Sequence, residues 1–152
     1  MRSAPPHEKK GFSYLTCFYL FILSASIAFA QVQTRIRVIE ASNVGSSFDS
    51  SLKDVTGQLG SLFSFSSYRL LKDETVALSP SRPVSISVHP GRSLELTLIK
   101  QRRHTAEIRV QIKREGTDIL DTQVRLSPGR TVSIGGPKHG QGTLLIALSA
   151  SF

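Results

Sequence analysis

Few residues in this chain of 152 have the types and spacing that chemistry requires. Beyond residue 30 the histidines are His89, His104 and His139, and no two of them have the close spacing of a zinc-ligand pair. Serine is abundant, but no serine lies in the G-x-S-x-G pattern of a hydrolase nucleophile. We therefore predict a non-enzymatic protein without cofactor or metal. The alternatives are a zinc site built from the three scattered histidines and a glycosidase pair of carboxylates that meet only in space.

A glycine-rich segment covers residues 135–142. It lacks the G-K-[ST] ending of a phosphate-binding loop, and a strand pattern follows it, so no helix N-terminus would direct amide groups at an anion. We predict a flexible connection between the last two strands, in which glycines supply positive φ angles. Lys138 and His139 at its tip could form part of a contact surface.

A basic cluster is the strongest candidate for a binding site. Its members are Lys100, Arg102, Arg103 and His104, at the junction of two predicted strands, and Arg109, Lys113 and Arg114 on the outward face of the second strand. No aromatic residues alternate with these cations, which argues against binding of single-stranded nucleic acid by stacking. The cluster predicts contact with a partner protein, an anionic lipid or an anionic glycan.

The first 30 residues have the pattern of an export signal. Basic residues precede an apolar run over 12–29, and residues 28–30 have the small-x-small sequence that signal peptidase needs. We predict cleavage before Gln31, which leaves 152 − 30 = 122 residues in a single exported domain, 31–152. The alternative is an uncleaved anchor, because an apolar run of about 18 residues can just span a bilayer.

Removal of the first 30 residues would change the composition of the domain that remains. Cys17 is the only cysteine and would leave with the signal, so disulfides and thiolate metal sites are excluded. The basic residues would number 19 − 3 = 16 and the acidic residues 11 − 1 = 10, a net charge of +6 that favours anionic neighbours. We expect a periplasmic or extracellular location, peripheral to the outer membrane, with no nucleic acid partner and no membrane insertion after cleavage.

One segment near the start of this domain predicts an amphipathic helix. Its apolar residues recur at spacings of 4, 3, 4 and 3 over Phe48–Leu62. Ser46 and Ser47 are the candidate caps, and Asp49 falls in the first turn near the positive end of the helix dipole. Two glycines weaken the helix, so we expect it to pack against a sheet.

The other segments predict strands. Residues 32–39 alternate apolar and polar types, 68–71 and 75–78 flank a charged turn at 72–74, and further alternating runs follow after residue 83. In the last run, 143–151, both faces are apolar over several positions, which predicts a central strand covered on both sides. The pattern indicates an α+β, mainly β domain: an antiparallel sheet or β-sandwich with one helix.

Two short segments resemble proteins of the bacterial envelope. Residues 128–136, PGRTVSIGG, resemble the D-G-x-T-V-x-I-G-G hairpin in the β-domain of secretins, with proline in place of the usual acidic residue. Residues 144–152, LLIALSASF, are similar to the closing strand of outer-membrane β-barrels, although the predicted helix and the few aromatic residues conflict with that architecture. The secretin resemblance implies a small envelope protein with secretin-like hairpin pieces.

Together these observations predict an exported, non-enzymatic domain of the cell envelope. Its expected partner is a protein or assembly component, bound through exposed sheet edges or the basic strand face. The alternative is binding of an anionic lipid or glycan through that basic face.

Overall fold

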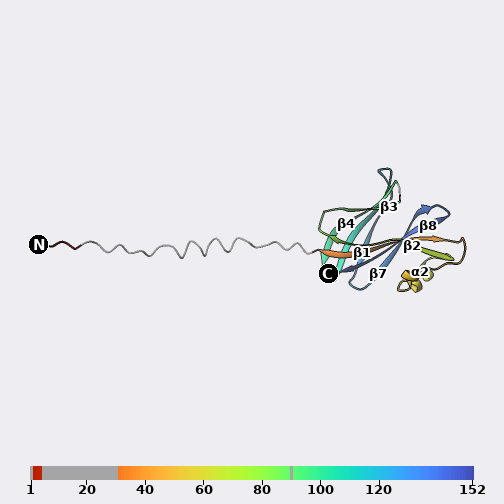
Figure 1. Ribbon diagram of the computed structural model, residues 1–152, viewed down its shortest axis with the longest axis horizontal. Coiled ribbons are helices and arrows are strands. Elements are labelled where there is room, and N and C mark those ends of the chain that lie inside the picture. Colours follow the sequence, from red (N-terminus) through yellow and green to blue (C-terminus); the bar gives the residue numbers. More distant parts are fainter. Residues whose placement is uncertain (1, 5–30, 90) are drawn as a thin grey trace.

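The protein folds into two facing four-stranded sheets (Figure 1). The structure is a computed structural model that describes residues 2–4, 31–89 and 91–152, so the apolar run of the predicted export signal lies outside the described residues. The first sheet has the strand order β2-β1-β8-β7, the second has β3-β4-β5-β6, and neighbouring strands are antiparallel. The predicted mainly β, sandwich-like fold with one α-helix is confirmed. No helix in the described ranges is long and apolar enough to cross a membrane.

Most of the strands are long, and the longest connection, between β1 and β2, contains the helices. The strand bounds are β1 Val32–Ser42, β2 Ser67–Leu78, β3 Val84–His89, β4 Arg92–Arg102, β5 Thr105–Arg114, β6 Thr117–Leu126, β7 Thr131–His139 and β8 Gly142–Ser151. The helical segment between β1 and β2 consists of the 3-10 helix η1, Ser50–Leu52, and the α-helix α2, Thr56–Leu62.

The main core lies between the two sheets. Alternating residues of every strand point into it, and most are leucine, isoleucine or valine. The fully buried examples with the largest side chains include Ile36, Leu78, Leu94, Leu96, Leu98, Ile108 and Leu144. Because a side chain of this size contributes about 1.5–3 kcal/mol when buried, this layer supplies most of the stability of the sandwich.

Strand β8 is buried on both faces, as its sequence predicts. It lies between β1 and β7, and one face packs Leu144, Ile146 and Leu148 into the core between the sheets. The other face packs Leu145 and Ala147 into a second cluster beneath the helical segment. The helical segment therefore serves as a cover for the outer face of the first sheet (Figure 1).

The predicted single helix over Phe48–Leu62 is wrong in its bounds. The predicted caps Ser46 and Ser47 are not used; instead Asp49 caps η1, accepting a hydrogen bond from the Ser51 backbone N–H at 3.0 Å. Asp49 also accepts from the backbone N–H of Leu70 on β2, which holds it in an extended conformation. A residue fixed in that way cannot continue a helix, so the helical segment begins only after it.

The two helices pack through part of the apolar stripe. Leu52, Val55 and Leu59 are buried against the sheet, whereas Phe48 and Leu62 are exposed. Phe48 lies instead beside Tyr68 of β2, with 5.6 Å between the ring centroids. The amphipathic period thus identified the covering segment correctly but overestimated its length.

The predicted turn at 72–74 is also wrong, because β2 is continuous. Its pairing with β1 passes through these residues, with a bulge where Val38 pairs with Lys72 and Ile39 pairs with Leu70. Asp73 points to the outer face and pairs with Arg35, whereas Lys72 and Glu74 point to the other face and pair with each other. The long partner strand keeps the chain extended where the local composition indicates a turn.

The predicted connection in the glycine-rich segment is shorter than expected. Strand β7 continues through residue 139, and within this segment only Gly140 has a positive φ, of 57°. A Cβ atom on Gly136 would lie 2.8 Å from the Leu144 carbonyl oxygen, and one on Gly142 would lie 2.3 Å from that of Ala41. Glycine at these two positions therefore permits close packing of backbones.

The cover of the first sheet can be tested with two leucines of α2. Leu59→Ala should lower the free energy of unfolding by about 2–5 kcal/mol, because Leu59 is fully buried against β8 and its neighbours. Leu62→Ala, a matched control with an exposed side chain, should change it by about 0.5 kcal/mol or less. Chemical denaturation of the full chain measures both, and equal losses would contradict the packing described.

Candidate functional site

The seven predicted basic residues do not form one patch. Four of them, Lys100, Arg102, Arg103 and His104, are exposed together at the β4–β5 turn. Arg114 lies at the far end of β5, about 30 Å along the strand at 3.3 Å per residue. The cluster at the β4–β5 turn, called the basic turn below, is therefore a separate surface.

Arg109 and Lys113 lie between these ends, on the outer face of the second sheet, and both are paired with acids. Arg109 binds Asp121 of β6, with 2.9 Å between its Nε and Oδ1, and Lys113 binds Glu95 of β4, with 3.2 Å between Nζ and Oε2. Arg125 and Glu107 form a third pair on this face. The outer face of the second sheet thus carries alternating charges.

The predicted histidines are also far from forming a shared site. His104 is exposed at the basic turn, and His139 lies on β7 with 13% of its side chain exposed. The His89 side chain lies outside the described part of the structure. Within the described ranges, no group of three or more histidine, cysteine, aspartate or glutamate residues could hold a metal ion.

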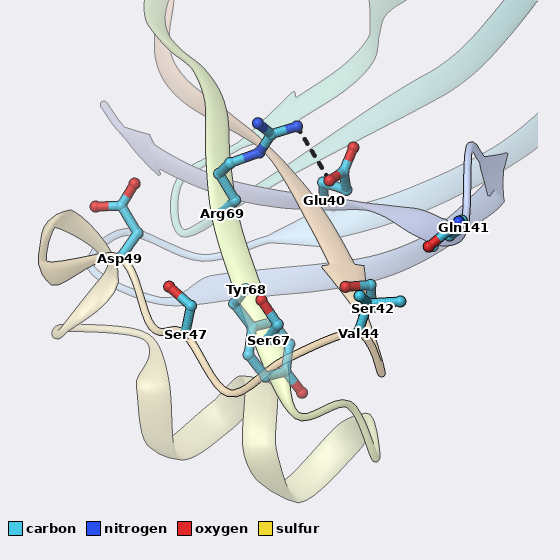
Figure 2. A pocket seen from close by; sticks show the side chains of 10 residues that line it. Glu40, Ser42, Val44, Ser47, Asp49, Ser67, Tyr68, Arg69 and Gln141 are labelled. Carbon is cyan, nitrogen blue, oxygen red and sulfur yellow. Dashed lines mark hydrogen bonds and ion pairs between the residues drawn. The ribbon is translucent and has the colours of Figure 1, made fainter.

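A series of polar contacts lies at one end of the sandwich. Arg69 of β2 donates to Glu40 of β1 at 3.1 Å, and Glu40 lies 3.4 Å from Nε2 of His139 on β7. His139 in turn contacts Arg92 of β4 at 3.2 Å, so these contacts connect the two sheets. Figure 2 shows Arg69 and Glu40 beside an open pocket of about 590 Å³, which Tyr68 also lines.

The most developed polar site is a groove on the outer face of the first sheet, called the arginine groove below. The helical segment covers only part of that face, and the groove lies beside it, with Asp54 of that segment in its lining. The groove encloses about 390 Å³ and is lined by Gln33, Arg35, Arg37, Asp54, Thr75, Gly129, Thr131, Ser149, Ala150 and Ser151.

The strand register explains the floor of this groove. Arg35 of β1 lies directly opposite Thr75 of β2 and Ser149 of β8, and Ser149 lies opposite Thr131 of β7. All four residues share the outer face because directly paired residues point to the same side of a sheet. The floor is thus a row of three hydroxyl groups with one arginine among them.

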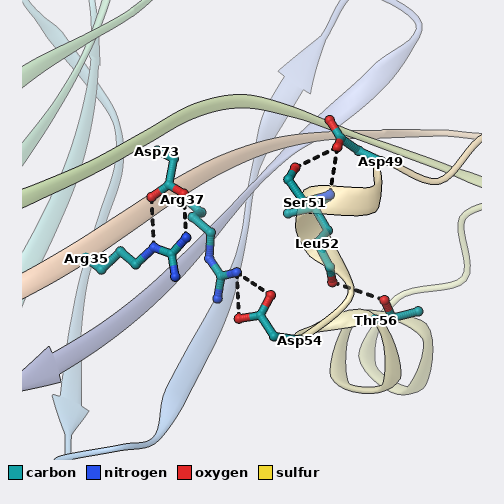
Figure 3. Close-up of polar contacts among 8 residues, drawn as sticks. All are labelled: Arg35, Arg37, Asp49, Ser51, Leu52, Asp54, Thr56 and Asp73. Atoms are coloured by element: carbon teal, nitrogen blue, oxygen red, sulfur yellow. Dashed lines mark hydrogen bonds and ion pairs between the residues drawn. The ribbon is translucent and has the colours of Figure 1, made fainter.

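Two arginine–aspartate pairs hold the groove together (Figure 3). Arg35 binds Asp73 through two bonds, from Nε to Oδ1 at 2.9 Å and from Nη2 to Oδ2 at 2.6 Å. Arg37 directs Nη1 at both oxygens of Asp54, at 2.7 and 2.8 Å. Only 2% of the Arg37 side chain is exposed, so it is fixed between the sheet and the helical segment.

The carboxylates of the groove stay ionised at neutral pH. The hydrogen bond from Arg35 lowers the pKa of Asp73 below its ordinary value, and the bond from Arg37 lowers the pKa of Asp54 in the same way. Hydrolysis by a glycosidase needs one carboxyl group that is still protonated near neutral pH. This pair of aspartates therefore suits binding and does not suit acid–base catalysis.

The groove retains hydrogen-bonding capacity for a ligand. In the described part of the chain, Nη1 of Arg35 donates no hydrogen bond, and 46% of the Arg35 side chain is exposed, whereas Arg37 is almost fully buried. Hydroxyl groups of Thr75 and Ser149 lie along the same floor and can donate or accept. Such a set of fixed donors and acceptors can bind carbonyl or carboxylate oxygens.

The sequence contains only a partial sign of this site. Arg35 and Arg37 are visible as polar residues that alternate with apolar ones in the first strand. Their acidic partners lie 38 and 17 residues away, so no local spacing connects them. Asp73 in particular is misread as part of a turn.

Comparison with protein-family models, with curated proteins and with solved structures found no match. The resemblance of residues 128–136 to secretins therefore stays a prediction. In the structure these residues form the end of the β6–β7 connection and the start of β7, and the two strands belong to different sheets.

Protonation of Asp73 at acid pH should lower the stability of the fold at the arginine groove. A carboxylate whose pKa is lower in the folded state stabilises the fold above the unfolded-state pKa, and this stability is lost as the pH falls through the folded-state pKa. We expect Asp73→Asn to be less stable than the wild type at pH 7, with a difference that shrinks below about pH 4. Urea denaturation at several pH values measures this.

The matched control is Asp118→Asn, which removes an exposed carboxylate that accepts from the Gln111 amide and from no arginine in the described ranges. It should leave the acid dependence of the wild type in place. If Asp73→Asn has the same stability as the wild type at pH 7, the Arg35–Asp73 pair does not hold the groove.

Proposed function

We propose that the protein is an exported, non-enzymatic domain of the cell envelope that binds a partner protein at the arginine groove. The observation that carries this proposal is the guanidinium group of Arg35, which is held by Asp73 and partly exposed beside an uncovered row of hydroxyl groups. The export pattern of the first 30 residues supports the location.

Fixed donors favour association for a physical reason. A long side chain loses conformational freedom when it is ordered at an interface, and each such loss costs about 0.5–1.5 kcal/mol. Arg35 is already ordered by its two hydrogen bonds to Asp73, so it binds with little further loss. Arginine is also the charged residue most enriched at protein interfaces.

A protein ligand fits the balance of charges in the groove. The two aspartates offset the two arginines, so a strongly charged ligand of either sign gains little from the groove as a whole. An extended peptide segment carries both carbonyl acceptors and N–H donors along its length. It can therefore use the unused Nη1 of Arg35 and the hydroxyl row together.

A photo-crosslinking residue can test this proposal in the native envelope. Placed at Thr75, an exposed position in the groove, it should form an adduct with one defined protein. Arg35→Ala in the same chain should reduce the adduct, because it removes the donor next to that position. The readout is mass spectrometry of the adduct.

Ser85 provides the matched control position, since it is also exposed and also lies on an edge strand, β3. It should form no such adduct. The proposal fails if Thr75 forms adducts only with lipid or glycan, or if both positions capture the same protein.

A second candidate function is binding of an anionic lipid or glycan at the basic turn. The observation that favours it is the exposure of Lys100, Arg102, Arg103 and His104 at one end of the sandwich, next to Ile99, whose side chain is 45% exposed. Cations beside an exposed apolar side chain are a combination typical of surfaces that meet anionic head groups.

Heparin, an acidic glycan, is a simple probe for this second function. Reversal of two charges with Arg102→Glu and Arg103→Glu should make the full chain elute from a heparin column at clearly lower salt. The matched control is Lys53→Glu with Lys138→Glu, two exposed lysines elsewhere, which should shift the elution less. Equal shifts would show that net charge alone controls the binding.

A further inference from the structure

The four edges of the two sheets differ in how they are protected. Edge strand β2 is bridged to β3, because Lys72 donates to the Ser87 carbonyl oxygen at 2.7 Å. Strand β3 is only six residues long and follows Pro83, and β7 contains Pro137 and an irregular register. Proline, short length and irregular pairing are the usual means by which an edge avoids a further strand.

Strand β6 has none of these features over most of its length. It contains no proline, and its one bulge, at Ile119, lies near its start. From Leu120 to Leu126 it pairs with β5 without interruption, while its other side has no hydrogen-bonded neighbour strand in the described structure. This leaves a regular edge that can accept another strand.

The side chains of β6 are complementary to themselves in one antiparallel register. If two copies pair with Gln123 opposite Gln123, Asp121 of each copy lies opposite Arg125 of the other. On the inner face, Leu120 lies opposite Leu126 of the second copy. In antiparallel registers shifted by two or four residues along the strand, Asp121 of one copy no longer lies opposite Arg125 of the other.

The charged residues are available for such contacts. Arg125 is 70% exposed and donates to Glu107 through Nη2, and Asp121 is 38% exposed and accepts from Arg109. The hydrogen bond from Arg109 lowers the pKa of Asp121, so this carboxylate is charged at neutral pH. Both groups keep unused hydrogen-bonding positions for a partner across the edge.

We propose that two copies of this chain associate through β6, around a two-fold axis at Gln123, into one continuous eight-stranded sheet. A two-fold contact of this kind joins the same surface of each copy and closes on itself, so it does not propagate into fibres. The added strand also covers Leu120 and Val124, which are only partly buried at the edge of the core. The arginine groove lies on the other sheet and stays open in this arrangement.

Sedimentation velocity of the full chain, in a density-matched non-ionic detergent, tests this dimer. Arg125→Asp would place aspartates opposite each other twice, once on each side of the axis, and should raise the dimer Kd about tenfold or more. The matched control is Arg69→Asp, because Arg69 is also on an edge strand, is 65% exposed and donates through Nη2 to a glutamate of the neighbouring strand. It should leave the dimer Kd unchanged.

A cross-link tests the register independently. In a chain with Cys17→Ser, Gln123→Cys should form a disulfide between two copies on oxidation, whereas Thr75→Cys on the edge of β2 should not. The proposal is overturned if the wild-type chain is monomeric, if the two arginine variants weaken the dimer equally, or if Gln123→Cys forms no cross-link. After any of these results, β6 would be an edge that pairs with a strand of another protein or stays unpaired.

Discussion

Burial of β8 on both faces is the constraint on which the rest of the structure depends. Leu144, Ile146 and Leu148 need the second sheet as a partner, while Leu145 and Ala147 need a cover on the opposite side. The helical segment between β1 and β2 provides that cover with three buried apolar residues. Because the segment is short, it covers one part of the sheet and leaves the other part open to solvent.

The arginine groove follows from this incomplete cover. Arg37 lies where the apolar cover ends, so its guanidinium group is removed from water and requires a partner. Asp54, in the connection between the two helices, supplies it and thereby attaches the cover to the strand. Beyond this point the same face carries Arg35 and hydroxyl groups, which makes the boundary between buried and open sheet a polar surface with fixed geometry.

The positive charge of the chain is unevenly distributed over its surface. On both outer faces, arginines and lysines are matched by carboxylates of neighbouring strands. Exposed pairs of this kind contribute about 1 kcal/mol or less each, but they prevent accumulation of one sign on the sheets. The unmatched excess is most concentrated at the basic turn, so the two candidate surfaces differ in character: one is balanced and ordered, the other is basic and exposed.

Sequence periodicity predicted the architecture well, for a physical reason. An apolar residue at every second position means one buried face, and the two apolar faces of residues 143–151 correctly indicated a strand covered on both sides. The errors occur where a distant contact overrides local preference. Charged residues at 72–74 read as a turn because Arg35, the partner of Asp73, is remote in sequence, and glycines at 136 and 142 read as part of a connection because the backbones that approach them are remote too.

The candidate site was harder to predict from the sequence for the same reason. Local spacing can group residues such as Arg102 and Arg103, which are neighbours in the chain, and the structure does keep these two together at the basic turn. It cannot group Arg37 with Asp54 or Arg35 with Asp73, because those pairs exist only after β1, β2 and the helical segment have packed.

Thiol accessibility in the intact envelope, the location that we propose for the protein, tests most directly whether the arginine groove is the functional surface. In a chain with Cys17→Ser, a cysteine replaces either Ser149 in the groove or Thr97 on the outer face of the second sheet; both positions are partly exposed. We expect Ser149→Cys to react with a polar maleimide in the purified chain but to be protected in the envelope, while Thr97→Cys reacts in both. Equal reaction of Ser149→Cys in both settings would contradict the account.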